Sequence, residues 1–117
     1  MEPITKQILS WLTQSGLPAL DANGFASCAI ITDYDHICRL NQEVRAIDSW
    51  AAGFSWPDER WIVGEDGAGN YFVVTKGDMF GVVEFFDHEG LRFEPEKASL
   101  RDFFEYCLAI EAASKKS

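Results

Sequence analysis

The sequence predicts an α+β fold in which an antiparallel β-meander sheet is packed with N-terminal, central and C-terminal helices. The main evidence is the stretch Arg60–Glu94, where four short apolar or β-branched runs alternate with three glycine-containing turns. Helical periodicity appears on both sides of this stretch, and helices packed on an antiparallel sheet bury both kinds of pattern. The chain has 117 residues, and we expect residues 1–117 to form a single domain.

The meander is expected to contain four strands. They are Trp61–Gly64, Tyr71–Lys76, Val82–Asp87 and Leu91–Glu94. Successive residues of a strand point to opposite faces, so the third strand places Val83 and Phe85 on one face and Val82 and Phe86 on the other. We therefore expect that strand to be central and covered by helices on at least one side. A further strand is predicted at Phe25–Thr32, before the central helix.

Three segments have helical periodicity. Residues 3–15 carry an apolar stripe after Pro3, and a second stripe runs from about His36 to Ala52. The C-terminal helix is the clearest, because Ser99 is a good N-cap with Asp102 three residues later. Its apolar positions then follow at helical spacing: Leu100, Phe103, Phe104, Cys107 and Leu108.

Composition excludes several classes of function. The net charge is −9, and the acidic residues outnumber the basic ones by seven to three in residues 1–58 and by twelve to seven in residues 59–117. No basic surface is available for nucleic acid, so we expect no direct binding to DNA or RNA. No apolar run approaches a membrane span, and the N-terminus lacks a signal-peptide pattern. The three cysteines include no CxxC pair, which predicts reduced thiols and a cytoplasmic protein.

The polar motifs give no specific chemistry. The Gly64–Gly69 segment has GxxGxG spacing and precedes a strand, so a hairpin turn explains it better than a nucleotide site. Two histidines without metal-ligand spacing predict no metal and no cofactor. Glu84 lies in an apolar strand, and we favour a place on the more exposed sheet face over a buried catalytic role. A small hydrolase using Glu84, Asp87 and His88 remains an alternative.

Three segments in order resemble the SUKH superfamily, the group related to the yeast Smi/Knr cell-wall-synthesis regulators. They are Trp61–Phe72, Gly81–Glu89 and Ser99–Leu108, and the similarity covers roughly residues 56–110. The resemblance implies an α+β domain with no catalytic residues. It also implies that the glycine-rich turn and the start of the next strand define the fold, through Asp66, Gly67, Gly69 and Gly81.

Bacterial proteins similar to this family are commonly immunity proteins that bind and neutralise a co-encoded toxin, often a nuclease. The resemblance therefore implies a non-enzymatic binding protein with a basic toxin domain as its partner. The predicted binding surface is the more polar face of the meander and its turns. It consists of Asp66, Glu84, Asp87, Glu89 and Glu94, with Trp56 or Phe86 as an aromatic anchor. The eukaryotic relatives imply an alternative, a regulatory scaffold with several partners; the oligomeric state is not predicted.

Overall fold

The computed structural model describes residues 3–14, 29–30, 34–47, 50, 53–66, 68–78 and 80–115. The elements, in chain order, are α1 (Pro3–Gln14), β1 (Ala29–Ile30), α2 (Tyr34–Ala46), β2 (Arg60–Glu65), β3 (Tyr71–Thr75), β4 (Val83–Asp87), β5 (Arg92–Lys97) and α3 (Leu100–Lys115). The predicted α+β class is confirmed. Within the described residues, no helix combines the length and the apolar character needed to cross a membrane.

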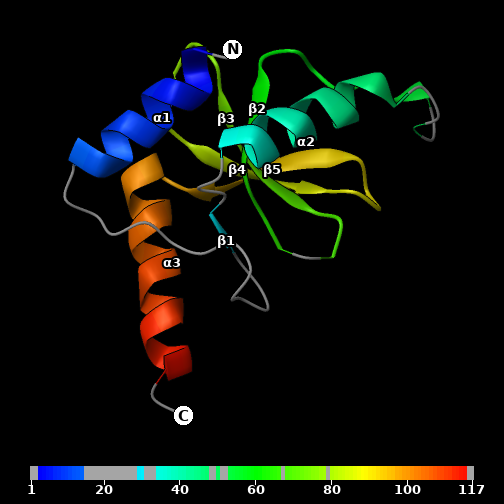
Figure 1. The fold of residues 1–117 in the computed structure, drawn as a ribbon. Coiled ribbons are helices and arrows are strands. Elements are labelled where there is room, and N and C mark those ends of the chain that lie inside the picture. Colours follow the sequence, from blue (N-terminus) through cyan, green and yellow to red (C-terminus); the bar gives the residue numbers. More distant parts are fainter. Residues whose placement is uncertain are drawn as a thin grey trace.

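The five strands form one antiparallel sheet in the order β1-β2-β3-β4-β5 (Figure 1). The predicted meander is therefore confirmed, and β4 lies between β3 and β5 as expected. β5 extends further than predicted, to Lys97. From the predicted strand Phe25–Thr32, the described part is β1, which pairs with Gly64 and Glu65 of β2. The remainder of that prediction lies outside the described residues.

Helices cover both faces of the sheet. On one face, α1 and α3 pack against alternate residues of the central strands (Figure 1). This first core cluster contains Ile8, Trp61, Val63, Phe72, Val74, Val83, Leu100, Phe103, Phe104 and Cys107. On the other face, α2 and the loop before β2 pack against the intervening residues. This second core cluster contains Ile37, Val44, Trp56, Ile62, Val73 and Phe86. Both faces of the central strands carry apolar residues, and each face is buried by helices. The result is a three-layer arrangement with the sheet in the middle.

Local signals explain where two helices begin and end. The Ser99 hydroxyl accepts a hydrogen bond of 3.1 Å from the Asp102 amide, so the predicted N-cap of α3 is confirmed. Helix α2 ends at Ala46 and is shorter than the predicted segment to Ala52. The carbonyl of Val44, in the last turn of α2, accepts a hydrogen bond of 3.3 Å from the Trp50 indole. A side chain from beyond the helix therefore satisfies a carbonyl of the last turn, as helix ends require.

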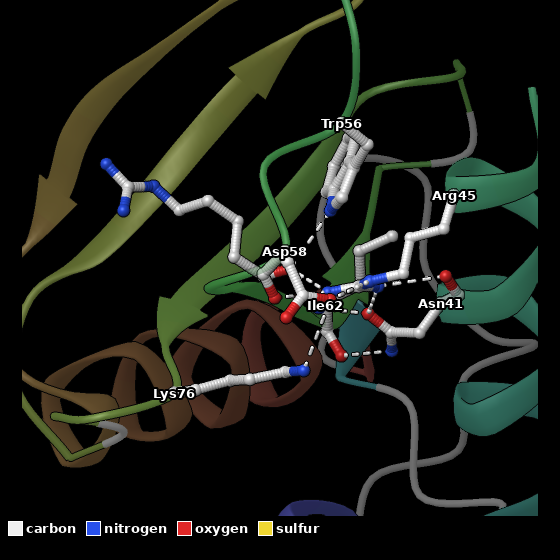
Figure 2. A network of polar contacts seen from close by, with 7 residues as sticks. Asn41, Arg45, Trp56, Asp58, Ile62 and Lys76 are labelled. Atoms are coloured by element: carbon white, nitrogen blue, oxygen red, sulfur yellow. Dashed lines mark hydrogen bonds and ion pairs between the residues drawn. The ribbon is translucent and has the colours of Figure 1, made fainter. Parts of the chain in front are cut away.

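Side chains from α2 and from the loop before β2 bond to the part of the β2 edge that precedes its described pairing with β1. The side chain of the buried Asn41 makes two hydrogen bonds to the backbone of Ile62. Its Oδ1 accepts from the Ile62 amide at 2.7 Å, and its Nδ2 donates to the Ile62 carbonyl at 3.1 Å. Arg45 donates to the Arg60 carbonyl at 2.8 Å, and the Trp56 indole donates to the same oxygen at 3.0 Å (Figure 2). The side chains thus replace the backbone groups of a neighbouring strand.

The same network continues across the end of β2. Arg45 Nη1 donates to the Asn41 carbonyl at 2.9 Å, and its Nε lies 3.4 Å from Asp58 Oδ1 (Figure 2). Lys76 Nζ lies 3.6 Å from the same carboxylate oxygen. Arg45 and Lys76 also lie over the Trp61 ring, at 5.1 and 5.3 Å from its centroid. These contacts fix α2 and the β3 end against β2.

The opposite edge of the sheet is protected by composition. β5 has the sequence RFEPEK, so four of its six residues are charged and one is a proline. Pro95 has no amide hydrogen to offer to an added strand, and charged side chains on an edge disfavour pairing with another chain. We therefore expect partners to bind elsewhere than along this edge.

Replacing Asn41 with alanine should lower the free energy of unfolding by about 3 kcal/mol, because the Ile62 amide and carbonyl lose their partners while buried. Urea denaturation of the two proteins measures this difference. The exposed neighbour Gln42 provides the control, and Gln42→Ala should change the stability by less than about 0.5 kcal/mol. Equal effects of the two substitutions would contradict the edge-covering role.

Candidate functional site

The predicted binding residues that lie in turns come together at one end of the sheet. There, the β2–β3 turn and the β4–β5 turn are joined by side chains. The Asp66 carboxylate accepts hydrogen bonds from the Ala68 amide at 2.8 Å, the Asn70 amide at 3.1 Å and the Asn70 side chain at 2.8 Å. Asn70 Oδ1 accepts in turn from the His88 amide at 3.0 Å and lies 2.6 Å from His88 Nδ1. Asp66 therefore shapes the turn as well as contributing its charge.

Two of the predicted fold-defining glycines have a steric reason in the structure. Gly69 has a φ of +92°, and a Cβ at this position would lie 3.4 Å from His88 Nδ1. A Cβ on Gly81 would lie 2.3 Å from Asp78 Oδ2, so the Asp78 side chain would have to move. The positive φ makes glycine the natural residue at position 69. Gly67 lies outside the described residues.

Acidic side chains lie in these turns and beside them, and the charge of Glu43 on α2 acts on Tyr71 at the start of β3. We call these acidic residues the acidic end of the sheet, and they are Glu43, Glu65, Asp66, Asp87 and Glu89. The pKa of Tyr71, which begins β3 there, is raised above its ordinary value of 10.0. Burial is the main cause, and the charges of Glu65, Glu43 and Asp66 add to it. The negative field at this end therefore reaches a half-buried phenol.

The neighbouring turn holds its carboxylate in the ionised form. Asp87 Oδ1 accepts a hydrogen bond of 2.9 Å from the Glu89 amide. The pKa of Asp87 lies below its ordinary range, because the Glu89 and Gly90 amides bond to the charged form and because Arg92 and His88 lie near. Glu89 is exposed beside it. On the α2 side, His36 Nε2 lies 3.7 Å from Glu65 Oε2.

The structure places Glu84 differently from the exposed face that the sequence favoured. Its side chain is only 18% exposed, and Oε1 lies 2.8 Å from Arg60 Nε. The Nε–H is not aligned with the carboxylate as a hydrogen bond requires, so the contact is an ion pair. Arg60 also lies over the Phe93 ring, 5.2 Å from its centroid. Glu84 thus belongs to the packed face beneath α2 and not to an open carboxylate surface.

The other predicted binding residues separate into two groups. Trp56 is 8% exposed and Phe86 is fully buried, and both belong to the second core cluster. The structure therefore uses these two aromatic residues for packing. Glu94 is exposed on β5, where its Oε1 lies 3.2 Å from Arg92 Nε. It faces solvent but lies outside the acidic end.

The three residues of the hydrolase alternative do not converge. Glu84 and Asp87 are three residues apart on one strand, which separates their Cα atoms by about 10 Å and directs them to opposite faces. Glu84 is paired with Arg60, whereas His88 contacts Asn70. In the described part of the chain, no group of three or more His, Cys, Asp or Glu side chains is placed to hold a metal ion.

A groove that the sequence did not reveal lies beside α1. It has a volume of about 530 Å³ and is lined by Lys6, Gln7, Ser10, Trp11, Gln14 and Phe80. Trp11 lies in the apolar stripe predicted for residues 3–15, and Phe80 lies in a predicted glycine-containing turn. A phenylalanine inside a glycine-containing turn was the available signal, since such a residue has no strand face in which to be buried.

Two members of the acidic end, Glu43 and Glu65, were not among the binding residues predicted from the sequence. Glu65 and Tyr71 flank the predicted turn, so their positions beside Asp66 follow from the hairpin. Glu43 comes from α2, and its approach to the turn depends on how that helix packs on the sheet. Periodicity gives the buried face of a helix but not the strand that it crosses.

Comparison with protein-family models, with curated proteins and with solved structures found no match. The functional conclusions below therefore depend on the residues and geometry of this chain and on the resemblance described above.

Replacing Glu65 with glutamine should lower the pKa of Tyr71, because one of the charges that oppose phenolate formation is removed. NMR titration of isotopically labelled tyrosine measures this change. Glu94→Gln, which neutralises an exposed carboxylate outside the acidic end, should leave the Tyr71 titration unchanged. An equal effect of both substitutions would contradict the local field.

The same shift predicts how stability depends on pH. The folded-state pKa of Tyr71 lies above the unfolded value near 10.0, so this contribution is fully present below pH 10 and is lost as pH rises through the folded-state pKa. Tyr71→Phe should remove that part of the alkaline loss. Denaturant unfolding between about pH 9 and pH 11 measures it, and an unchanged pH profile in the variant would contradict the assignment.

Proposed function

We propose that this protein is a non-enzymatic protein-binding domain of the SUKH superfamily that docks a basic partner at the acidic end of the sheet. The observation that carries this proposal is the joining of the two hairpin turns that carry Glu65, Asp66, Asp87 and Glu89, with the charge of Glu43 on α2 acting on Tyr71 beside them. Direct binding to nucleic acid is disfavoured by the same charge. A basic protein surface is the complementary partner.

The geometry supports binding because the acidic end is both accessible and held in place. The Glu43 side chain is 61% exposed, and Glu89 is also exposed. The side-chain oxygens of Asp66, Asn70 and Asp87 accept hydrogen bonds from backbone amides, and these bonds fix the two turns that carry the charges. A surface that is ordered before binding loses less conformational entropy on association.

Within this function, we propose the role of a cytoplasmic immunity protein that neutralises a co-encoded toxin, such as a nuclease. A nuclease domain carries basic residues for its nucleic-acid substrate, and an acidic partner is attracted to that surface during diffusion. Blocking the basic surface would prevent substrate binding without any reaction by the immunity protein. The resemblance to the SUKH superfamily and the charge of −9 support this role.

The two alternatives differ in what they need from the structure. A Smi/Knr-like scaffold would use the same accessible surface for several partners with lower affinity. A hydrolase would need Glu84, Asp87 and His88 in one place, and their separation along and across β4 gives this alternative no support. The binding proposal is therefore the one that the arrangement favours.

The first experiment captures partners of the tagged full-length protein from its own cells and elutes them with increasing salt. The immunity role predicts one stoichiometric basic partner that is released as ionic strength rises. Several weakly bound partners would favour the scaffold, and the absence of any salt-sensitive partner would contradict the proposal.

Once the partner is purified, the double variant Glu43→Lys/Glu89→Lys should slow its association at low salt by about tenfold or more. The expected cause is the loss of electrostatic attraction at the acidic end. Stopped-flow or surface-based kinetics at two salt concentrations measures the rate.

The matched control is Glu59→Lys/Glu96→Lys. These residues are also exposed, and the substitution changes the net charge by the same amount, but Glu59 precedes β2 and Glu96 lies toward the end of β5, away from the acidic end. Equal slowing by both double variants would show a general charge effect and would contradict docking at this end.

A further inference from the structure

The groove beside α1 has an aromatic floor that the fold holds in place. Trp11 and Phe80 lie with their ring centroids 5.3 Å apart, and Phe104 of α3 supports Trp11 at the same centroid distance. The Phe80 carbonyl accepts a hydrogen bond of 3.4 Å from the Leu100 amide, which ties its loop to the start of α3. Phe80 nevertheless remains 41% exposed. An apolar side chain from outside could therefore contact a preformed surface.

The charge of this groove is opposite to that of the whole protein. Of the described residues that line it, Lys6 is the charged one, and none of them carries a carboxylate. The Arg101 guanidinium lies beside it, 5.8 Å from the Trp11 ring centroid. The Phe80 loop also contains Asp78. Its carboxylate lies against Gly81, where a Cβ added to the glycine would clash with it.

Among the described side chains, Lys6 shares with Lys97, which lies over the Tyr106 ring, the lack of a carboxylate within 4.0 Å. Six other basic side chains in the described part of the chain lie within 4.0 Å of a carboxylate, and they are Arg39, Arg45, Arg60, Lys76, Arg92 and Arg101. Because the Lys6 side chain is exposed, an incoming group can approach its charge.

We propose that this groove binds an acidic peptide segment of a partner protein, through an aromatic or large aliphatic side chain flanked by carboxylates. The apolar side chain contacts Trp11 and Phe80, and a neighbouring carboxylate pairs with Lys6. Gln7 and Gln14 on the same face of α1 carry amides that can bond to the peptide backbone. A basic partner would meet a like charge here, so this surface is distinct from the acidic end and goes beyond the function proposed above.

The shape and size of the groove suit a short peptide segment. Gln7, Trp11 and Gln14 recur at four- and three-residue spacing, which aligns them along one side of α1. A volume of 530 Å³ accommodates a few side chains, not a whole domain surface. The occupant is therefore expected to be a short segment.

The test uses a random 12-residue peptide library displayed on phage and selected against the full chain. Enrichment of peptides that combine Asp or Glu with an aromatic or large aliphatic residue is expected. Synthetic copies of the enriched peptides should lose about tenfold in affinity for Phe80→Ser, because an anchor contact is removed. They should lose severalfold for Lys6→Glu, since the charge pair becomes a repulsion.

Arg39→Glu is the matched control, because it changes the net charge as Lys6→Glu does at an exposed site on α2. It should leave the affinity of the peptides unchanged. Circular dichroism checks that each variant folds. If Phe80→Ser does not fold, Lys6→Glu alone decides the test, because Lys6 is exposed and its substitution is not expected to disturb the fold.

Three results would overturn the inference: no enrichment, retained affinity in both groove variants, or equal loss in the Arg39→Glu control. Enriched basic peptides that lose affinity in Glu43→Lys/Glu89→Lys would overturn the groove proposal while supporting the acidic end. Acidic peptides sensitive to Lys6 would support the groove even if the acidic end proved inactive. Concentration-dependent dimerisation abolished by Phe80→Ser, without peptide binding, would replace the peptide by a second copy.

Discussion

Asn41 satisfies the Ile62 amide and carbonyl at a part of the β2 edge where the described residues place no strand, and the position of α2 depends on this contact. In the described residues, β1 pairs with Gly64 and Glu65, so the preceding part of β2 would otherwise bury unpaired backbone groups there. Each such group costs about 1 to 3 kcal/mol when buried without a partner. The Asn41 side chain supplies both a donor and an acceptor, and Arg45 supplies the donor for the Arg60 carbonyl. The helix is therefore fixed to β2 by directional bonds as well as by apolar packing.

The proposed binding surface follows from this attachment. With α2 fixed on β2, Glu43 contributes to the same negative field as Glu65 and Asp66, and the Tyr71 phenol responds to all three charges. The hydrogen bond that the His88 amide donates to Asn70 Oδ1 brings the second hairpin turn to the same end. The opposite charge of the Lys6 groove lies in the layer formed by α1 and α3. The fold thus separates two surfaces of different sign, one at the hairpin turns at the end of the sheet and the other beside α1.

Much of the fold could be predicted from local pattern, because strand alternation, glycine-containing turns and the Ser99 cap are all encoded by neighbouring residues. The position of Glu84 could not, because its partner Arg60 comes from another strand and their approach depends on the register of β2, β3 and β4. Trp56 and Phe86 were expected at a binding surface because the covering of both sheet faces was not known from sequence. Asn41 did leave a signal, since it lies between Ile37 and Val44 on the apolar side of its helix. The groove joins Trp11 to Phe80 across most of the chain, and no local pattern reports such a contact.

Amide hydrogen exchange at Ile62 tests most directly whether a side chain replaces the missing strand at the β2 edge. This amide faces away from β3 and donates to Asn41 Oδ1 at 2.7 Å. If α2 is fixed as described, Ile62 should exchange as slowly as Val73 at the centre of the sheet, because both require global unfolding. Exchange of Ile62 at the rate of an exposed turn amide would show that the edge opens locally, and it would contradict the attachment on which the acidic end depends.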